Sequence, residues 1–311
     1  MKKARLLVYH RHAKTYVDLL RKSLPNLLLH GASTPEEALP FIEEAEILLV
    51  GKIPDTLLPK ARNLLWLAST WAGNEELIES PYLPERVLFT KATCYGEMMA
   101  EYVFAYCLSF IRHVSKYRED QREKAWRPKR PERLRGKTMG ILGLGSVGRV
   151  IAQRAKDFGM DVLGLKKSHD PVAEVDELFV PEKVRELIPR VDYLVSALPL
   201  TPETYHFLKE PELGLLKEGA TLFNIGRGKT IDEKALIQVL KTRKIRAVLD
   251  VFETEPLPPE SELWNMENVV VTPHVSGASI PEEVCDEFVK NYERWMKGEP
   301  LQGLVDRKKG Y

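Results

Sequence analysis

Short apolar runs alternate with amphipathic segments along most of the chain. Before residue 95, apolar runs of strand length lie at 5–9, 46–51, 64–69 and 86–90. A helical pattern occupies 34–45, where Thr34 has the position of an N-cap and Pro35 that of the first helical residue. Such alternation is typical of a parallel sheet covered by helices. We therefore expect residues 1–95 to form a small α/β domain.

The rest of the chain repeats this alternation with more strongly apolar strands. Parallel strands that are buried on both faces read as near-continuous apolar runs. Runs of this kind lie at 138–142, 161–165, 192–198, 220–225, 245–250 and 268–273. We expect a second, doubly wound α/β domain over 96–276. The helical pattern at 281–300 is expected to pack back on the first domain, which would then be discontinuous (1–95 and 277–311).

Two segments lead from the first domain into the second. Residues 96–119 are apolar almost all round as far as Ile111, which predicts one long, buried helix. Residues 120–137 are polar, rich in Arg and Lys, and contain two prolines. This stretch is interpreted either as a solvated loop or as an arm that crosses a subunit interface, with Trp126 as its apolar anchor.

Composition excludes several classes of protein. A length of 311 residues suits two domains, and a formal net charge of +1 lacks the basic excess typical of nucleic-acid binding. The three cysteines have no metal-ligand spacing, which indicates free thiols in a reducing cytoplasm and no metal site. No segment approaches about 18 uninterrupted apolar residues, so no membrane span is expected. The apolar run after Met1–Lys3 is too short for a signal peptide.

A glycine-rich motif lies between a predicted strand and a predicted helix. Residues 143–148 read Gly-Leu-Gly-Ser-Val-Gly, after the strand at 138–142 and before a helical pattern at 147–158. In this context Gly143 permits a tight turn, Gly145 lets a pyrophosphate approach the backbone, and Gly148 lets helix and strand pack closely. The helix start at Ser146 and Val147 offers free N–H groups to phosphates. The motif therefore predicts that 96–276 is a dinucleotide-binding domain. The alternative is that the glycines only form a structural turn between strand and helix.

The next strand ends at Leu165 and is followed by Lys166, Lys167 and Ser168. An acidic residue at such a strand end holds the ribose hydroxyls of NAD. Two cations and a hydroxyl would instead bind the 2′-phosphate of NADP, and two charge-assisted contacts would favour NADPH over NADH by roughly 10²-fold. The alternative is that both lysines are ordinary exposed residues.

Three polar residues follow three different strands of the second domain: Arg227, Glu255 and His274. The carboxyl ends of parallel strands meet at one edge of the sheet, where ligands bind. Arg227 suits bidentate binding of a carboxylate, and His274 suits proton transfer near neutral pH. Glu255 would hold the imidazole ring and stabilise its protonated form. The set fits reduction of a 2-oxo acid, although each residue alone also has a structural interpretation.

Five ordered segments, at 136–148, 192–204, 222–232, 247–258 and 268–277, resemble the D-isomer-specific 2-hydroxyacid dehydrogenases. The resemblance implies a Rossmann cofactor domain, a smaller discontinuous flavodoxin-like substrate domain, an active site in the cleft, and homodimers formed through the cofactor domain. It assigns Arg227, Glu255 and His274 to catalysis and places Asp250 near the nicotinamide carboxamide. The Lys-Lys-Ser stretch resembles the NADPH-preferring glyoxylate and hydroxypyruvate reductases of this family.

The resemblance also assigns further binding residues. Trp71, Ala72 and Gly73 match the loop that offers N–H groups to the substrate carboxylate, with Arg227 and His274 completing the substrate site. Asn74-Glu75 stands here in place of the family's Val-Asp, and Trp71 either narrows the pocket or packs in the core. Other cofactor contacts are expected at Leu198, Pro199, Thr204, Ile225 and Gly277.

Two alternative functions stay open. A nucleotide-sensing corepressor that resembles this family would keep a similar Arg, Glu and His. A family oxidoreductase acting on another substrate, such as phosphite, would use the same machinery.

Overall fold

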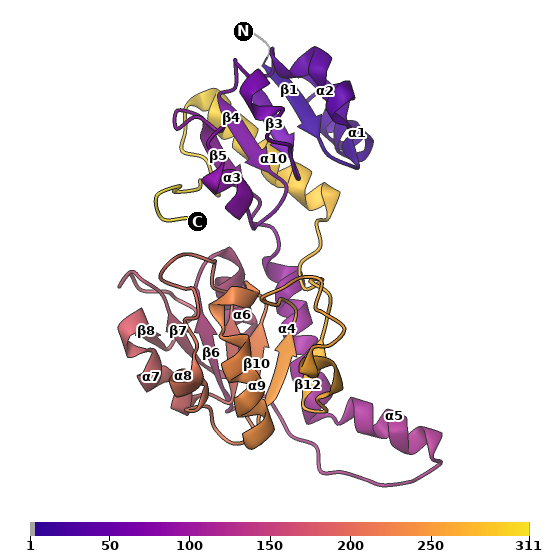
Figure 1. Cartoon of the computed structure of the whole chain (residues 1–311), viewed down its shortest axis with the longest axis vertical. Helices are drawn as coiled ribbons and strands as arrows, with labels where there is room; N and C mark the ends of the chain where they lie inside the picture. Colours follow the sequence, from indigo (N-terminus) through magenta and orange to yellow (C-terminus); the bar gives the residue numbers. More distant parts are fainter. Residues whose placement is uncertain (1–3, 311) are drawn as a thin grey trace. The chain divides into compact units, whose positions relative to one another are not determined.

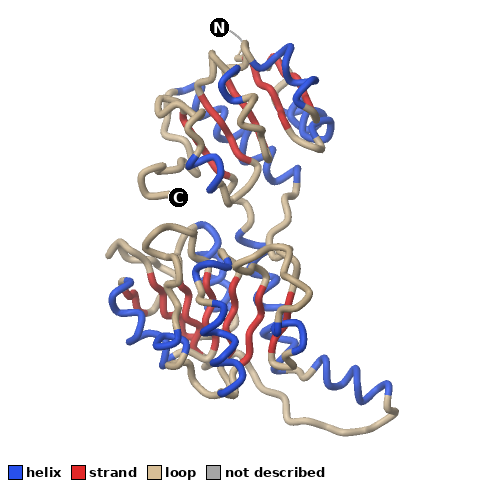
Figure 2. The backbone as a smooth tube through the Cα atoms, in the orientation of Figure 1, coloured by secondary structure: helices blue, strands red, loops and turns tan. Residues whose placement is uncertain are grey.

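The structure is a computed structural model that describes residues 4–310. Contacts along the chain divide it into two compact units, residues 4–95 with 279–310 and residues 96–278. Each unit is built on a parallel sheet with helices on both of its faces (Figures 1 and 2), so the expected α/β class is confirmed. That the first unit binds substrate and the second binds cofactor stays a prediction.

The first unit has a five-stranded sheet. Its strands are β1 (Arg5–Tyr9), β2 (Leu28–Ala32), β3 (Ile47–Val50), β4 (Trp66–Ser69) and β5 (Leu88–Lys91). Its helices are α1 (Ala13–Ser23), α2 (Pro35–Ile42), α3 (Glu75–Glu79) and α10 (Pro281–Lys297), with a 3₁₀ turn at Leu58–Lys60. The spatial order β2-β1-β3-β4-β5 is the flavodoxin-like order.

Two local predictions for this unit are confirmed. The Thr34 side chain accepts a hydrogen bond from the Glu37 N–H at 3.4 Å, as an N-cap of α2 does. Helix α10 packs into the core of this unit. There the buried Trp66 ring stacks on Phe288 with ring centroids 5.0 Å apart.

The second unit has a seven-stranded sheet. Its strands are β6 (Thr138–Leu142), β7 (Asp161–Leu165), β8 (Glu177–Phe179), β9 (Tyr193–Ser196), β10 (Thr221–Asn224), β11 (Arg246–Leu249) and β12 (Val269–Val271). Its helices are α4 (Gly96–Ile111), α5 (Val114–Arg122), α6 (Ser146–Asp157), α7 (Val184–Leu187), α8 (Glu210–Leu213) and α9 (Glu233–Thr242). Short 3₁₀ helices span Pro181–Lys183, Ile188–Arg190, Gly228–Thr230 and Glu262–Asn265.

The order β12-β11-β10-β9-β6-β7-β8 places the first strand, β6, inside the sheet, with the chain winding outward on either side. This is the Rossmann arrangement with one added strand. Successive residues of one strand enter different apolar clusters: Leu142 belongs to one and Ile141 to the other. Both faces of the sheet are therefore buried, which explains why its strands are near-continuous apolar runs.

The prediction of one long, buried helix over 96–119 is wrong. Helix α4 ends at Ile111, His113 adopts the left-handed conformation with φ of 53°, and α5 begins at Val114. Helix α4 buries one face only, so Val103 is buried while Glu101 is exposed. Figure 1 shows α5 and the loop after it running away from the sheet of their own unit.

Cys94, Cys107 and Cys285 are free thiols. Burial raises the pKa of Cys94 and of Cys285 to about 12, so both stay protonated at neutral pH. Within residues 4–310, no group of three His, Cys, Asp or Glu side chains is arranged to hold a metal ion. The helices described there include none with the length and apolarity needed to cross a membrane.

Candidate active site

Arg227, Glu255 and His274 follow three neighbouring strands of the second unit. Strand β10 pairs with β11, and β11 pairs with β12, all in parallel. Parallel pairing puts the carboxyl ends of these strands at one edge of the sheet. The structure thus brings together, within one unit, the three loops that the sequence predicted to carry the chemistry.

His274 and Glu255 form a hydrogen-bonded pair. The His274 Nδ1 lies 2.8 Å from the Glu255 Oε2, and the Phe252 N–H donates to the Glu255 Oε1 at 3.0 Å. A carboxylate only accepts, so Nδ1 carries the hydrogen of this bond and Nε2 is the nitrogen left for proton exchange. The side chains remain 50% and 37% exposed, so both are open to a ligand.

The buried carboxylate of Asp250 shapes the turn that carries His274. It accepts hydrogen bonds from the Thr272 hydroxyl at 2.6 Å and from the Val275 and Ser276 N–H groups at 2.8 Å each. The Tyr102 hydroxyl lies 2.6 Å from that of Thr272, and burial raises the pKa of Tyr102 well above its usual value. Thr272 and Tyr102 were not among the predicted site residues, although Thr272 is only two positions before His274.

Arg227 lies in a turn that packs closely against the segment leading to Glu255. Its Nη1 donates to the Gly226 carbonyl at 2.7 Å. A Cβ on Gly228 would lie 1.9 Å from the backbone of Phe252, so only glycine fits there. Phe252 is also the residue whose N–H holds Glu255. The Arg227 turn and the Glu255 segment are therefore in close contact at Gly228 and Phe252.

The glycine motif forms an open cradle at the start of α6. Gly143 has a φ of 95°, and a Cβ on Gly148 would lie 1.9 Å from the Gly143 carbonyl oxygen. Gly145 is the N-cap of α6, and a Cβ placed on it would meet nothing within 4 Å. This open space lies beside the N–H groups at Ser146 and Val147. The motif fits the pyrophosphate of a dinucleotide.

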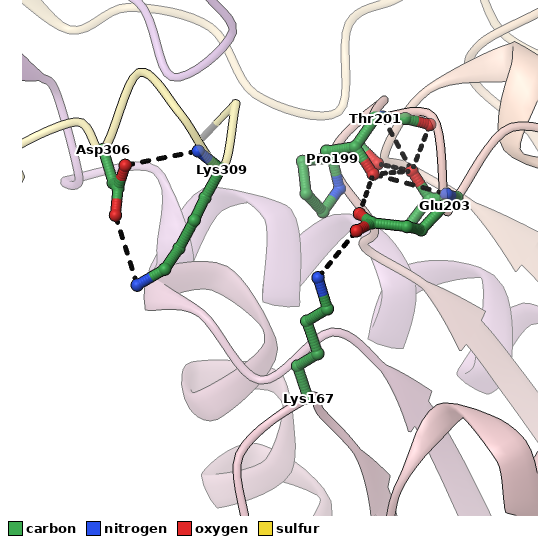
Figure 3. A network of polar contacts seen from close by, with 7 residues as sticks. Lys167, Pro199, Thr201, Glu203, Asp306 and Lys309 are labelled. Atoms are coloured by element: carbon green, nitrogen blue, oxygen red, sulfur yellow. Dashed lines mark hydrogen bonds and ion pairs between the residues drawn. The ribbon is translucent and has the colours of Figure 1, made fainter.

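The strand end at Lys166–Ser168 is already engaged with acidic side chains. The Lys167 Nζ donates to the Glu203 Oε1 at 2.9 Å, as Figure 3 shows, and the Lys166 Nζ lies 3.9 Å from the Asp170 Oδ2. Lys166 is largely buried, with 15% of its side chain exposed, whereas Lys167 and Ser168 are exposed. Glu203 was missed by the sequence analysis, because nothing local indicates that it meets Lys167.

Most other predicted cofactor residues lie at the same carboxyl edge of the sheet. Leu198, Pro199 and Thr204 belong to the loop after β9, where the Thr204 hydroxyl donates to the Pro199 carbonyl at 2.6 Å. Ile225 follows β10 and is buried, and its N–H donates to the Ser196 carbonyl at 3.1 Å. Gly277 follows the His274 turn.

The Trp71–Gly73 loop lies in the first unit, at the carboxyl end of β4. The Trp71 N–H donates to the Ser69 Oγ at 3.0 Å, and the Asn74 Nδ2 donates to the Trp71 carbonyl at 2.9 Å. The Trp71 side chain is 42% exposed, so its interpretation as a packed core aromatic is wrong. Asn74 thus helps to fix the loop at the position where the sequence departs from the family pattern.

Two glycine substitutions should separate packing from ligand access. Gly148→Ala forces a Cβ against the Gly143 carbonyl and should lower the melting temperature by about 5 °C or more. Gly145→Ala, the matched control, should leave the melting temperature within about 1 °C and weaken dinucleotide binding at least tenfold. Calorimetry measures the melting temperature of each variant, and a binding titration measures its affinity for the dinucleotide. Unchanged dinucleotide binding in Gly145→Ala would contradict the proposal that the pyrophosphate lies against Gly145.

Comparison with known proteins agrees with this geometry. A sequence profile described as "D-isomer specific 2-hydroxyacid dehydrogenase, NAD binding domain" matches residues 104–276. The chain is 31% identical over 275 residues to the glyoxylate/hydroxypyruvate reductase A of Serratia proteamaculans, covering 86% of this chain and 88% of that protein. It is also 34% identical over 288 residues to the D-3-phosphoglycerate dehydrogenase of Methanocaldococcus jannaschii. That match covers 88% of this chain and 54% of the relative, so the chain spans about half of the relative's length.

A solved structure is similar over the whole chain. It is a D-isomer specific 2-hydroxyacid dehydrogenase from Xanthobacter autotrophicus Py2 in complex with NADPH and MES. The TM-score is 0.90 at 31% identity, with 100% of both chains covered. The chain therefore belongs to the D-isomer-specific 2-hydroxyacid dehydrogenase family.

Proposed function

We propose that this protein is an NADPH-dependent D-2-hydroxyacid dehydrogenase that reduces glyoxylate, hydroxypyruvate or a similar small 2-oxo acid. The observation that carries the proposal is the 2.8 Å pair of His274 and Glu255 beside the Arg227 turn. A relative named glyoxylate/hydroxypyruvate reductase and a similar structure that holds NADPH support it.

The proposed reaction divides its tasks among three side chains. Bound NADPH supplies the hydride for the carbonyl carbon. The Arg227 guanidinium binds the substrate carboxylate through two N–H groups, and its charge polarises the adjacent carbonyl. His274 donates the proton of its Nε2 to the carbonyl oxygen, and in the reverse direction the same nitrogen accepts it. Glu255 holds Nδ1, which keeps the ring oriented and stabilises its charged form.

The cofactor preference is proposed to arise at the end of β7. Lys166 and Lys167 would face the 2′-phosphate of NADPH, and Ser168 would add a hydroxyl donor. Because Glu203 already pairs with Lys167 at 2.9 Å, a 2′-phosphate must compete with this carboxylate. The two lysines therefore favour NADPH, and Glu203 reduces that preference through like-charge repulsion.

We further propose that the protein is a cytoplasmic homodimer. Trp126 is 95% exposed in the segment after α5, and Tyr117 of α5 is also exposed. Aromatic side chains exposed on a projecting segment are suited to burial against a partner. The free thiols of all three cysteines favour a reducing compartment.

Removal of the proposed catalytic groups should greatly lower turnover and leave the cofactor site in place. His274→Ala should lower kcat for 2-oxo acid reduction by roughly 10²- to 10⁴-fold, because proton transfer is lost. Arg227→Ala should raise the KM for the 2-oxo acid and lower kcat/KM by at least about 10²-fold. Steady-state kinetics test both, with the exposed Lys234→Ala as control. The NADPH dissociation constant should change less than about twofold in these variants. Near wild-type turnover in either variant would contradict the assigned roles.

Charge changes at the strand end should move cofactor preference in opposite directions. Lys166→Asp with Lys167→Ala should shift the NADPH:NADH ratio of kcat/KM toward NADH by at least about tenfold. Glu203→Gln should shift the ratio a few-fold toward NADPH, because a competing charge is removed. Exposed Lys183→Ala serves as the control. An unchanged ratio in the double variant would mean that the lysines do not contact the 2′-phosphate.

Loss of the exposed aromatic should weaken the dimer. Trp126→Asp places a charge where an apolar anchor is proposed and should raise the dimer dissociation constant by at least about tenfold. Sedimentation velocity over a concentration series measures it, with Trp264→Asp, an exposed tryptophan elsewhere in the same unit, as control. A monomeric wild-type protein, or an unaffected variant, would contradict this interface.

A further inference from the structure

A second histidine–carboxylate pair lies beside the catalytic loops. The His206 Nε2 lies 2.9 Å from the Glu253 Oε1, and only 21% of the His206 side chain is exposed. The His206 ring stacks on Tyr205, with ring centroids 4.1 Å apart. Its backbone φ is 46°, a left-handed conformation that few non-glycine residues adopt. The proposed chemistry uses neither His206 nor Glu253.

Glu253 and Glu233 are joined by reciprocal hydrogen bonds. The Glu233 N–H donates to the Glu253 Oε1 at 3.0 Å, and the Glu253 N–H donates to the Glu233 Oε2 at 3.3 Å. The Glu253 Oε1 therefore meets both a backbone N–H and the His206 ring. Because Glu233 follows the Arg227 turn and Glu253 precedes Glu255, these bonds tie the loop after β10 to the loop after β11.

His206 brings a third loop to the same point. Its N–H donates to the Lys229 carbonyl at 2.8 Å, and the Leu208 N–H donates to the Thr230 carbonyl at 3.1 Å. Backbone hydrogen bonds thus join the loop after β9 to residues 229 and 230, which follow Arg227. That loop also carries the proposed cofactor residues Pro199 and Thr204.

Several carboxylates lie near the His206 imidazole, which can stabilise them as a hydrogen-bond donor. Burial, and then the charge of Glu253, raise the pKa of Glu233 above its usual value. Asp232 adds a third carboxylate, with its Oδ2 3.9 Å from the His206 Nδ1. Without the imidazole, the Glu253 carboxylate would lose one of its hydrogen-bond partners and would still face the charge of Glu233, which favours separation of their loops.

The spacing of these residues from the catalytic groups is short. Glu253 lies two positions before Glu255, and Phe252, which holds Glu255, packs against Gly228 beside Arg227. A displacement of about 1 Å at a reacting group can cost roughly 10²-fold in rate. Even a small separation of the two loops would change the distance between Arg227, the proposed carboxylate anchor, and Glu255, which orients the proposed proton donor His274.

We propose that His206, Glu253 and Glu233 are positioning residues that fix the separation of the Arg227 turn from the Glu255 segment. This inference rests on the proposed function for its kinetic consequence, but not for the structural one. His206 acts through Glu253, and Glu253 acts through the two loops that it joins.

A double-mutant cycle in the full-length protein tests the proposal. His206→Ala should lower kcat/KM for hydroxypyruvate about tenfold, with both a higher KM and a lower kcat, while the NADPH dissociation constant changes less than twofold. His206→Gln, which keeps a side-chain N–H for Glu253, should restore most of the loss. Glu253→Gln combined with His206→Ala should be no more than twofold worse than the poorer single variant. His30→Ala, which removes another stacked imidazole, is the control.

Amide hydrogen exchange supplies a readout that needs no turnover. The amides of Glu233 and Glu253 should exchange at least tenfold faster in His206→Ala than in the wild type, and His206→Gln should reverse this. Additive kinetic losses, an active wild type with an unaffected His206→Ala, or unchanged exchange at both amides would overturn the proposal. A wild type that reduces no 2-oxo acid would overturn the proposed function, and amide exchange alone would then decide whether His206, Glu253 and Glu233 hold the two loops together.

Discussion

The carboxylate of Asp250 fixes the turn on which the proposed chemistry depends. It lies at the carboxyl end of β11, is fully buried, and accepts hydrogen bonds from Thr272, Val275 and Ser276 of the loop after β12. A buried carboxylate is stable only when its oxygens are satisfied in this way. The bonds hold His274 in a left-handed conformation, with φ of 53°, so that its ring meets Glu255. The sheet supplies the position of the loops, and Asp250 supplies the orientation of the histidine.

Much of this arrangement is readable from the sequence, because parallel sheets impose regular patterns. Strands buried on both faces are apolar without interruption, and polar residues directly after them must share one edge of the sheet. This is why Arg227, Glu255 and His274 could be grouped despite their separation in the chain. The glycine motif was equally readable, since the close contact of Gly148 with Gly143 admits no side chain.

Other features depend on contacts that local sequence does not encode. Strand β2 (Leu28–Ala32) was not expected, because His30 and Gly31 interrupt its apolar run at the edge of the sheet. The helix predicted over 96–119 breaks at His113, where the backbone adopts a left-handed conformation that no neighbouring glycine or proline indicates. Glu203 and His206 gain their partners, Lys167 and Glu253, only through folding across the sheet edge. Residue patterns in the sequence therefore indicate the proposed catalytic groups more readily than the side chains that hydrogen-bond around them.

The proposed reaction and cofactor preference are tested together by kcat/KM for glyoxylate and hydroxypyruvate, measured in parallel with NADPH and with NADH. We predict turnover of at least one of these acids, with NADPH clearly preferred. Tight NADPH binding without turnover of either acid would contradict the proposed reaction and point to another substrate or a sensing role. Turnover with NADH preferred would leave the reaction in place and contradict the part assigned to Lys166 and Lys167.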